Sequence, residues 1–313
     1  MSLLIAITGW DPEAWRERFE RNLPDHAVFT LDDNYDPASI SYAACWHAPH
    51  GLLATLPNLE AVYSLGAGVD HLFADAGLPD VPLVRVVDPD LTNRMSEWVV
   101  MNVLLHHRRA PTYLAQQGAA LWQPWRDQPA AREVRVGVMG LGELGRDAAR
   151  KLTALGFDVA GWSRSGRPVE NIEVYGAEKL DAFLARTDIL VSLLPLTEET
   201  RGILDRTLFE KLARNGPLGG PVLLNAGRGG SQKDADIAAA LQDGTLIAAS
   251  LDVFEAEPLP ADSPLWGLPN IVITPHSAAE SSPDAVSAFI ARQIARIEAG
   301  ETPEGLVERS RGY

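Results

Sequence analysis

Short apolar runs separated by polar or helical segments occupy roughly the first 80 residues of the chain. The runs are rich in β-branched and aromatic residues and predict strands at LLIAITG, AVFTLD, YAACWHA, AVYSLG and PLVRVV. After the first run, DPEAWRERFERNL has the apolar period of a helix, with Asp11 as its N-cap and Pro12 in its first turn. Strands that alternate with helices predict right-handed crossovers and therefore a parallel sheet.

A second alternating pattern begins at Val134 and ends near His276. It predicts about six strands, at VRVGVMG, FDVAGWS, DILVSLLP, PVLLNAG, IAASLDV and NIVITP. The segments between them that predict helices are GRDAARKLTALG, EKLDAFLART, LFEKLARN and DADIAAALQDG. We therefore expect a second parallel sheet covered by helices.

A long helical stretch from Met95 to Trp122 and the proline-rich connector QPWRDQPAARE join the two patterns. Pro111 is expected to kink or split that helix, because proline lacks an N–H and clashes with the preceding turn. The last helical stretch, SPDAVSAFIARQIARIEAG, is expected to return to the first domain, since chain termini often lie close together.

These elements predict an α/β protein with two Rossmann-like, doubly wound parallel-sheet domains and a cleft between them. The first domain, flavodoxin-like, is expected to comprise residues 1–95 plus 280–313. The second, a dinucleotide-binding Rossmann domain, is expected to comprise residues 96–279. A length of 313 residues agrees with two domains rather than one core.

Composition narrows the class of protein and of partner. Hydrophobic residues make up 46% and charged residues 22% of the chain, as in ordinary globular proteins. The net charge of −15 disfavours nucleic acid and anionic membranes as partners. The apolar N-terminal run is short and has no basic residues before it, so it predicts a strand rather than a signal peptide, and no stretch approaches the length of a membrane span.

The single cysteine, Cys45, excludes an intramolecular disulfide and fits a reducing compartment, so we expect a cytoplasmic protein. Cys45, His47 and His50 superficially resemble a metal cluster. A zinc site needs four ligands and no fourth is nearby in the sequence, so no metal is predicted.

A glycine-rich loop, GLGELG, follows the apolar strand VRVGVM and opens a helix. Gly140 permits a tight turn, Gly142 lets the backbone approach a pyrophosphate, and Gly145 lets the helix pack on the strand. The N–H groups of Glu143 and Leu144 would then face a phosphate, with the helix dipole behind them. The loop therefore predicts a dinucleotide cofactor.

The next strand ends in VAGWSRSGR, where dinucleotide-binding folds usually place an acid for the ribose 2′-hydroxyl. Ser163 and Ser165 remove the repulsion that an acid exerts on a 2′-phosphate. Arg164, and in second place Arg167, can pair with that phosphate, and Arg164 is also suited to stacking on adenine. The segment favours NADPH, with NADH as a weaker cofactor. The alternative is a solvated basic loop with relaxed cofactor choice.

Three further segments fall at the carboxyl ends of predicted strands, the edge where α/β sheets bind ligands. They are LLNAGRGG with Arg228, SLDVFEAEPLP with Asp252 and Glu257, and ITPHSAA with His276. A histidine beside a carboxylate can deliver a proton near neutral pH, and an arginine fork suits a planar carboxylate. Glu257 could be a plain loop residue, and Glu255 is a nearby second candidate.

In the first domain, SLGAGVD ends a strand with Gly66, Ala67 and Gly68, whose consecutive N–H groups can form an anion nest. Such a nest would supply local positive potential on an acidic protein. Trp46 ends another strand of the same sheet. It would either border a small ligand or simply pack.

Taken together and in this order, these segments resemble the D-isomer-specific 2-hydroxyacid dehydrogenase family. The resemblance covers nearly the whole chain and rests on SLGAGVDHL, GLGELG, LLPLTEETRGIL, LNAGRGG, LDVFEAEPLP and ITPHSAA. Within the family, WSRS and the ending RSRGY are most similar to the glyoxylate/hydroxypyruvate reductase A branch. That branch is NADPH-dependent and cytoplasmic.

The resemblance implies a role for each residue of the candidate site. Arg228 would bind substrate and polarise its carbonyl, Glu257 would orient and charge the histidine, and His276 would be the acid/base that also contacts substrate. Asp252 would hold the carboxamide end of the nicotinamide. The matching segments also place three residues at the cofactor, namely Leu194, Pro195 and Ala226, and four at the substrate, namely Trp46, Gly66, Ala67 and Gly68.

The resemblance also implies a homodimer, in which Trp122, Trp125 and the apolar helix before them would pack across a two-fold axis. An intramolecular cap is the alternative. The expected reaction is NADPH-dependent reduction of glyoxylate to glycolate and of hydroxypyruvate to D-glycerate. Alternatives are another member of the family acting on a bulkier 2-oxo acid, on formate or on phosphite, and, ranked far lower, a non-catalytic nucleotide-sensing protein similar to transcriptional corepressors.

Overall fold

The computed structural model describes residues 1–311 and divides the chain into two compact units. Unit 1 comprises Met1–Leu91 and the segment from Ser281 onward, and unit 2 comprises Thr92–Glu280. Both boundaries lie within a few residues of the expected ones. Of the sequence ending RSRGY, Gly312 and Tyr313 lie outside the described residues.

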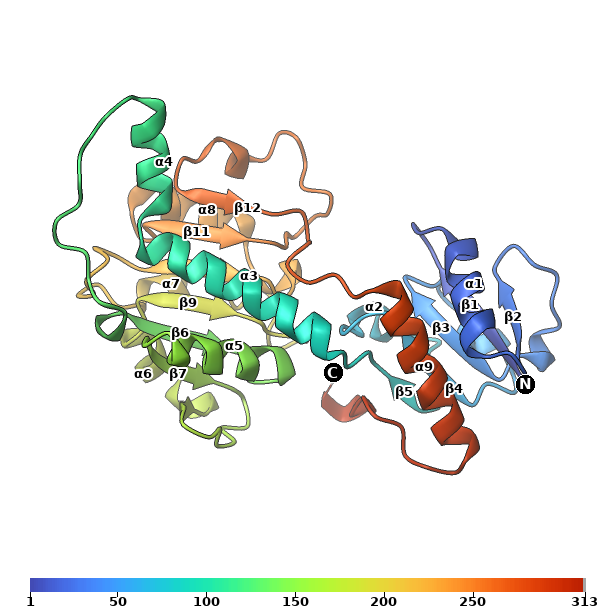
Figure 1. The fold of residues 1–313 in the computed structure, drawn as a ribbon. Coiled ribbons are helices and arrows are strands. Elements are labelled where there is room, and N and C mark those ends of the chain that lie inside the picture. The colour runs from blue at the N-terminus through green and yellow to red at the C-terminus, as the bar shows by residue number, and fades with distance from the viewer. Residues whose placement is uncertain (312–313) are drawn as a thin grey trace. The chain divides into compact units, whose positions relative to one another are not determined.

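Unit 1 contains a parallel sheet in the order β2-β1-β3-β4-β5, the strand order of flavodoxin-like folds (Figure 1). Its strands are β1 (Ser2–Ile7), β2 (Ala27–Thr30), β3 (Tyr42–Trp46), β4 (Ala61–Ser64) and β5 (Leu83–Val84). All residues of β1 are buried, which explains its continuous apolar run.

The strand expected at PLVRVV is only two residues long, because its backbone changes partners after Val84. The N–H of Arg85 donates to the carbonyl of Gly305, and the N–H of Val86 donates to the carbonyl of Gly66. The second of these bonds ties this segment to the turn that follows β4.

The helices of unit 1 are α1 (Pro12–Asn22), α2 (Asp70–Phe73) and α9 (Pro283–Glu298). The Asp11 side chain caps α1 by accepting from the N–H of Glu13 at 3.0 Å, as predicted. Helices α1 and α9 lie side by side, with Arg21 Nη2 and Asp284 Oδ1 2.6 Å apart (Figure 1). The last helix therefore does return to the first domain.

Unit 2 contains a parallel sheet in the order β12-β11-β10-β9-β6-β7-β8. Its strands are β6 (Arg135–Met139), β7 (Asp158–Trp162), β8 (Glu173–Tyr175), β9 (Ile189–Ser192), β10 (Val222–Asn225), β11 (Ala248–Leu251) and β12 (Ile271–Ile273). The order reverses at β6, between β7 and β9, and such a switch point opens a crevice at the carboxyl ends of these strands. Strand β8 was not predicted, because it is a short edge strand without an apolar run.

The helices of unit 2 are α4 (Ala110–Gly118), α5 (Glu143–Ala154), α6 (Leu180–Ala185), α7 (Arg206–Glu210), α8 (Asp234–Asp243) and most of α3 (Pro89–His107). The predicted long helix is split before Pro111, at Arg109, whose φ of 54° is left-handed. Helix α3 begins at Pro89, earlier than expected. None of the helices in residues 1–311 is both long and apolar enough to cross a membrane.

Candidate active site

The glycine-rich loop connects β6 to α5 at the switch point of unit 2. A Cβ on Gly145 would lie 1.8 Å from the carbonyl oxygen of Gly140, so only glycine allows this approach of helix and strand. Gly140 has a φ of 96° and packs against the Leu193 carbonyl, where a Cβ would lie at 2.7 Å. These are the steric roles that the motif predicts.

Helix α5 begins at Glu143 directly after the loop, with Gly142 as its N-cap. Among residues 1–311, no side chain caps its first turn. Its first N–H groups therefore lack a side-chain acceptor at the positive end of a twelve-residue helix, where a phosphate would bind well. The backbone of Glu143 and Leu144 is thus suited to the role expected of it.

The segment after β7 has no acid of its own, but an acid reaches it from another loop. Ser163 follows β7 directly, and its N–H donates to the carbonyl of Tyr175 at 3.1 Å. The Arg164 side chain is 42% exposed and forms an ion pair with Glu199, from the loop after β9. Ser165 lies next to it and is exposed.

The ends of β9 and β10 pack closely beside the glycine loop. A Cβ on Gly227 would lie 2.7 Å from the carbonyl oxygen of Leu194. The carbonyl of Pro195 accepts from the Thr200 hydroxyl at 2.7 Å, and the N–H of Ala226 donates to the carbonyl of Ser192 at 3.2 Å. The fold thus places the predicted cofactor residues 194, 195 and 226 at the same sheet edge as the loop.

His276 and Glu257 meet at this edge, although they follow different strands. Nδ1 of His276 lies 2.7 Å from Oε2 of Glu257, and the two side chains are 46% and 35% exposed. The hydrogen bond to Glu257 raises the pKa of His276 above its ordinary value, against partial desolvation. Partial burial opposes ionisation of Glu257, but hydrogen bonds from His276 and from the N–H of Phe254 outweigh it and lower the pKa of Glu257.

Arg228 follows β10 and is half-buried. Its guanidinium Nη1 donates to the carbonyl of Gly227 at 2.8 Å, and its positive charge acts on both Glu257 and His276. The structure therefore brings the three residues predicted to be catalytic into one group within unit 2. Glu255 instead accepts from the N–H of Asp234 at 2.6 Å, outside the histidine pair.

Asp252 is only 1% exposed, and its carboxylate holds the loop that carries His276. It accepts from the Thr274 hydroxyl at 2.5 Å and from the N–H groups of Ser277 and Ala278 at 2.9 and 3.0 Å. Its own carbonyl accepts from the N–H of His276 at 2.8 Å. This contribution to the position of the histidine was not predicted from the residue pattern.

The predicted anion nest of unit 1 follows β4. The Ser64 hydroxyl donates to the carbonyl of Gly68 at 2.7 Å and accepts from the N–H of Gly66 at 3.3 Å, which shapes the turn around Ala67. A Cβ on Gly66 would lie 2.8 Å from Cζ3 of Trp46. The indole therefore lies directly on the turn.

Trp10, which was not among the predicted site residues, packs against the Trp46 indole. Its ring stacks on Trp46 with centroids 4.9 Å apart and planes at 11°, and on Trp15 at 5.9 Å. His47 and His71 also contact the Trp46 ring, with centroids at 5.1 and 4.9 Å. These contacts hold the Trp46 ring in place on the turn that follows β4.

Cys45 and the two nearby histidines do not form a common group. The Cys45 thiol is buried, and burial raises its pKa to about 12. His50 is exposed and lies 3.9 Å from Asp75, whereas His47 contacts aromatic rings. Within the described part of the chain, no three potential ligand side chains are placed to hold a metal ion.

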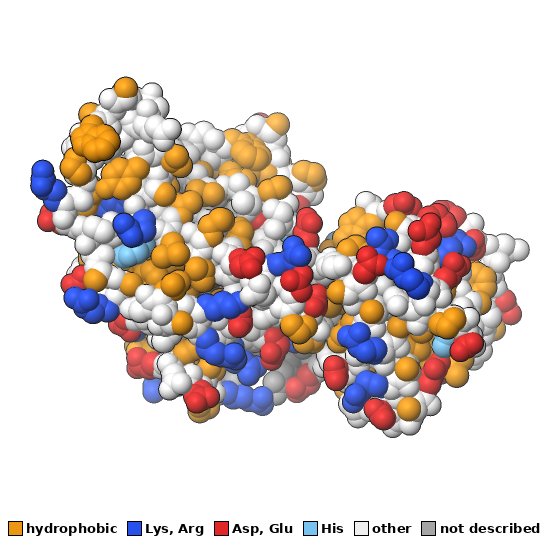
Figure 2. All heavy atoms as spheres, in the orientation of Figure 1, with side chains coloured by type: hydrophobic (Ala, Val, Ile, Leu, Met, Phe, Trp, Pro, Cys, Tyr) orange, Lys and Arg blue, Asp and Glu red, His pale blue; other side chains and the backbone are white. Residues whose placement is uncertain are grey.

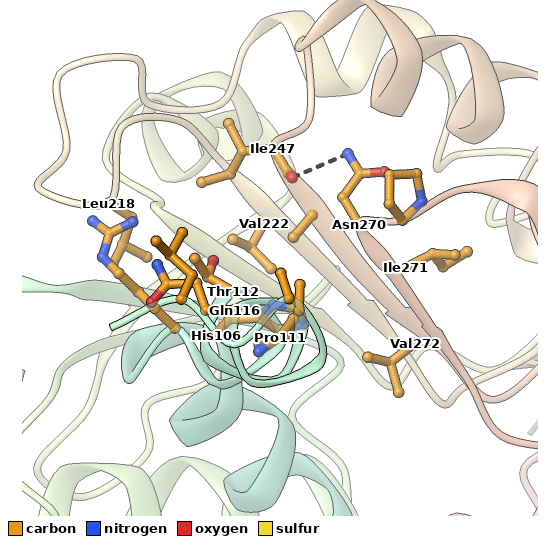
Figure 3. Close-up of a pocket in the computed structure, with 16 residues that line it drawn as sticks. His106, Pro111, Thr112, Gln116, Leu218, Val222, Ile247, Asn270, Ile271 and Val272 are labelled. Atoms are coloured by element: carbon orange, nitrogen blue, oxygen red, sulfur yellow. Dashed lines mark hydrogen bonds between the residues drawn. The ribbon is translucent and has the colours of Figure 1, made fainter. Parts of the chain in front are cut away.

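An exposed apolar segment, residues 110–125, includes α4 and is called the α4 arm below. Trp122 is 97% exposed, and four further large apolar side chains of the arm are also exposed, namely Tyr113, Leu114, Leu121 and Trp125. Figure 2 shows hydrophobic side chains gathered over this part of unit 2. A pocket of about 680 Å³ lies beside α4, lined among others by Pro111, Val222 and Ile271 (Figure 3).

Comparison with known proteins identifies the family. The family model described as D-isomer specific 2-hydroxyacid dehydrogenase, NAD binding domain, matches residues 100–278. The chain belongs to the D-isomer specific 2-hydroxyacid dehydrogenase family. This confirms the predicted family, its class of enzyme and a nicotinamide-dinucleotide-binding domain in the middle of the chain.

Curated relatives in this dehydrogenase family match the whole chain. The glyoxylate/hydroxypyruvate reductases A of Serratia proteamaculans and Salmonella paratyphi B are 38% and 40% identical to it, with 100% of each sequence covered.

Solved structures from the dehydrogenase family share the fold. A probable 2-hydroxyacid dehydrogenase from Rhizobium etli in complex with NADP, HEPES and tartaric acid is 47% identical, with a TM-score of 0.95. An NADPH-dependent glyoxylate/hydroxypyruvate reductase from Sinorhizobium meliloti in complex with NADP and sulfate is 49% identical, with a TM-score of 0.94. Each match covers 100% of this chain and 99% of the other. The predicted fold class is confirmed.

Proposed function

We propose that this protein reduces glyoxylate to glycolate and hydroxypyruvate to D-glycerate with NADPH. The observation that carries the proposal is the 2.7 Å contact between His276 and Glu257 within reach of the Arg228 charge, at the sheet edge that also bears the glycine-rich loop. The names of the relatives support the same reaction.

The residues of unit 2 fit a dinucleotide, because close backbone packing at Gly140 and Gly145 sets the turn into α5, and a Cβ on Gly142 would meet no atom of the other described residues within 4 Å beside the uncapped first turn of α5. In this proposal the N–H groups of Glu143 and Leu144 hold the pyrophosphate. Leu194, Pro195 and Ala226 line the cofactor, and Asp252 lies at the nicotinamide end. When bound, the reduced nicotinamide supplies a hydride.

Each proposed catalytic residue has a distinct task in the reduction. The Arg228 guanidinium binds the substrate carboxylate and carbonyl and stabilises the negative charge that develops on the carbonyl oxygen. The His276 imidazolium donates a proton to that oxygen from Nε2, because Nδ1 is engaged by Glu257. Glu257 keeps the ring oriented and charged, since it raises the pKa of His276.

The preference for NADPH is proposed to lie after β7. Ser163 and Ser165 present hydroxyls where an acid would repel a 2′-phosphate, and Arg164 offers a guanidinium to it. The NADP-bound relatives support this cofactor. NADH is proposed as a weaker alternative.

In unit 1 we propose that the turn Gly66-Ala67-Gly68 binds the substrate carboxylate through its N–H groups and that Trp46 limits substrate size. We also propose a homodimer held by the α4 arm, because Trp122 and four neighbouring large apolar side chains are exposed together and such exposed apolar patches mark interaction sites. A cytoplasmic location agrees with a single buried cysteine, and a net charge of −15 argues against nucleic acid as a partner.

Initial rates of NADPH oxidation with glyoxylate, hydroxypyruvate and pyruvate test the proposal, with formate and phosphite plus NADP⁺ as the rival substrates. We expect turnover with the first two acids and a loss of about 100-fold or more in kcat for His276→Ala, with NADPH binding retained. Absence of turnover with both acids, or an unchanged rate in the variant, would overturn it.

A further inference from the structure

A buried glutamine lies between the two loops that carry Arg228 and Glu257. Gln232 is 1% exposed, and both N–H groups and the oxygen of its side-chain amide are hydrogen-bonded. Its Oε1 accepts from Nδ2 of Asn225 at 2.7 Å, and its Nε2 donates to the carbonyl of Val253 at 2.9 Å and to Oδ1 of Asp234 at 2.7 Å.

The Nε2 side of the Gln232 amide connects through hydrogen bonds to His276. The Val253 carbonyl that Gln232 binds belongs to the same peptide group as the N–H of Phe254. That N–H donates to Oε1 of Glu257 at 3.0 Å, and the other oxygen of Glu257 contacts His276. A single rigid peptide plane therefore separates the Gln232 amide from the carboxylate that charges the histidine.

The Oε1 side of the Gln232 amide connects through Asn225 to the backbone of Arg228. Asn225 Nδ2 also donates to the carbonyl of Arg228 at 3.3 Å, and Asn225 Oδ1 accepts from the N–H of Gly227 at 3.0 Å. The two loops touch directly as well, because a Cβ on Gly229 would lie 1.7 Å from the carbonyl oxygen of Phe254. The same Cβ would lie 2.7 Å from the backbone nitrogen of Phe254, so the Arg228 loop packs against the Val253–Phe254 peptide as well.

We infer that Gln232 is a positioning residue that fixes Glu257 and Arg228 relative to each other, so that the proton donor and the substrate-binding cation keep one geometry. Burying an amide costs folding free energy unless its polar atoms are hydrogen-bonded, whereas an apolar side chain fills the same space without that cost. An amide at this position therefore indicates that its hydrogen bonds have a purpose beyond packing. Hydrogen bonds in such a chain also polarise one another, which strengthens the last bond to Glu257. This inference rests on the proposed function.

The test compares Gln232→Met, which keeps the volume and removes the amide, with Gln293→Met as a matched control. Gln293 is also 1% exposed, but it lies in α9 of unit 1, where its Oε1 accepts from the N–H of Glu304 at 2.8 Å. Three quantities are measured for each full-length variant: the pH profile of kcat/KM, KM and kcat separately, and the pKa of His276 by NMR titration assigned with His276→Ala.

For Gln232→Met we expect kcat to fall about tenfold, because a small displacement of reacting groups has effects of this size or larger. KM for the 2-oxo acid should rise because the Arg228 loop loses its support. Both the alkaline limb of kcat/KM and the NMR midpoint of His276 should move to lower pH by about half a pH unit. Gln293→Met should lower the thermal midpoint without moving either pH midpoint.

Should Gln232→Met not fold, Gln232→Asn replaces it, since a shorter amide loses the span to Val253 while remaining polar; the same directions are expected. Unmoved midpoints and kcat in the folded Gln232 variant would overturn the inference, as would equal shifts in the Gln293 control. Failure of the proposed function gives a different result from failure of this inference. If the proposed function is wrong, the wild-type protein reduces neither acid, and the NMR titration of His276 still shows whether Gln232 affects the histidine.

Discussion

The Nδ1 atom of His276 and the Oε2 atom of Glu257 lie 2.7 Å apart, and the contact shifts both groups toward their charged forms. The raised pKa of His276 means that its charge contributes stability below the ordinary value of 6.5, and that this is lost as the pH rises through the raised value. The lowered pKa of Glu257 means that its contribution is present above 4.5 and lost as the pH falls through the lowered value. Both contributions are therefore fully present between pH 4.5 and pH 6.5, and the His276 contribution is lost first as the pH rises.

Removing the charge of Glu257 should move the activity toward acid. In Glu257→Gln the pKa of His276 falls, so the alkaline limb of kcat/KM for reduction moves to lower pH, and activity at pH 8 drops by about tenfold or more. Glu255→Gln is the matched control, since Glu255 bonds the Asp234 N–H rather than the histidine. A shift in the control with none in Glu257→Gln would assign the carboxylate to Glu255 instead.

Cofactor preference should depend on the segment after β7. Ser163→Asp combined with Arg164→Ala introduces repulsion and removes the cation, so the ratio of kcat/KM for NADPH to that for NADH should fall by about tenfold or more. Steady-state kinetics with both cofactors measures the ratio, and Arg167→Ala serves as a control with a smaller effect. If the double variant keeps the wild-type ratio, the phosphate is held elsewhere.

Substrate size should depend on the Trp46 indole. Trp46→Ala removes the ring that lies on Gly66, so kcat/KM for bulkier 2-oxo acids should rise by about tenfold relative to glyoxylate. Trp10→Ala should act in the same direction but more weakly, because it releases the stacked ring. Trp266→Ala, at an exposed indole of unit 2, is the control. A substrate profile unchanged in both variants would leave Trp46 a packing residue.

Association should depend on the α4 arm. Trp122→Ala with Trp125→Ala removes exposed indole surface and the cation–π contact in which the Arg109 guanidinium lies 3.8 Å from the Trp125 ring. Sedimentation should show a dimer for the wild type and a dissociation constant raised by at least about tenfold in the variant. Leu155→Ala changes an exposed apolar residue outside the arm and should leave association intact. A wild-type monomer would favour the intramolecular cap.

The strands were predictable where both faces of a parallel sheet are buried, because such strands have continuous apolar runs, as in β1 and β9. Strand β8 was missed because its residues are half-exposed or exposed and give no such run. The break at Arg109 was predicted only approximately, since proline marks a helix start without fixing the conformation of the preceding turn.

Residue types at strand ends predicted that His276 and Glu257 would meet, but the contacts around them were not predictable. Trp10, Gln232 and Glu199 contact Trp46, Val253 and Arg164, which are distant in sequence, and periodicity or spacing gives no local signal for such pairs. The sequence around Gln232, GRGGSQKDAD, is polar throughout and does not distinguish this residue from its neighbours. Its partners become visible only when the loops after β10 and β11 are brought together.

The ion pair between Arg164 and Glu199 has a further consequence for cofactor choice. If Arg164 has its proposed role, a 2′-phosphate would compete with the Glu199 carboxylate for this guanidinium, and nucleotide binding there would exchange one anion for another. The net gain is the difference between two ion pairs rather than the full strength of one. Selectivity between the two cofactors thereby becomes a graded quantity that substitutions on the distant loop can tune without touching the nucleotide.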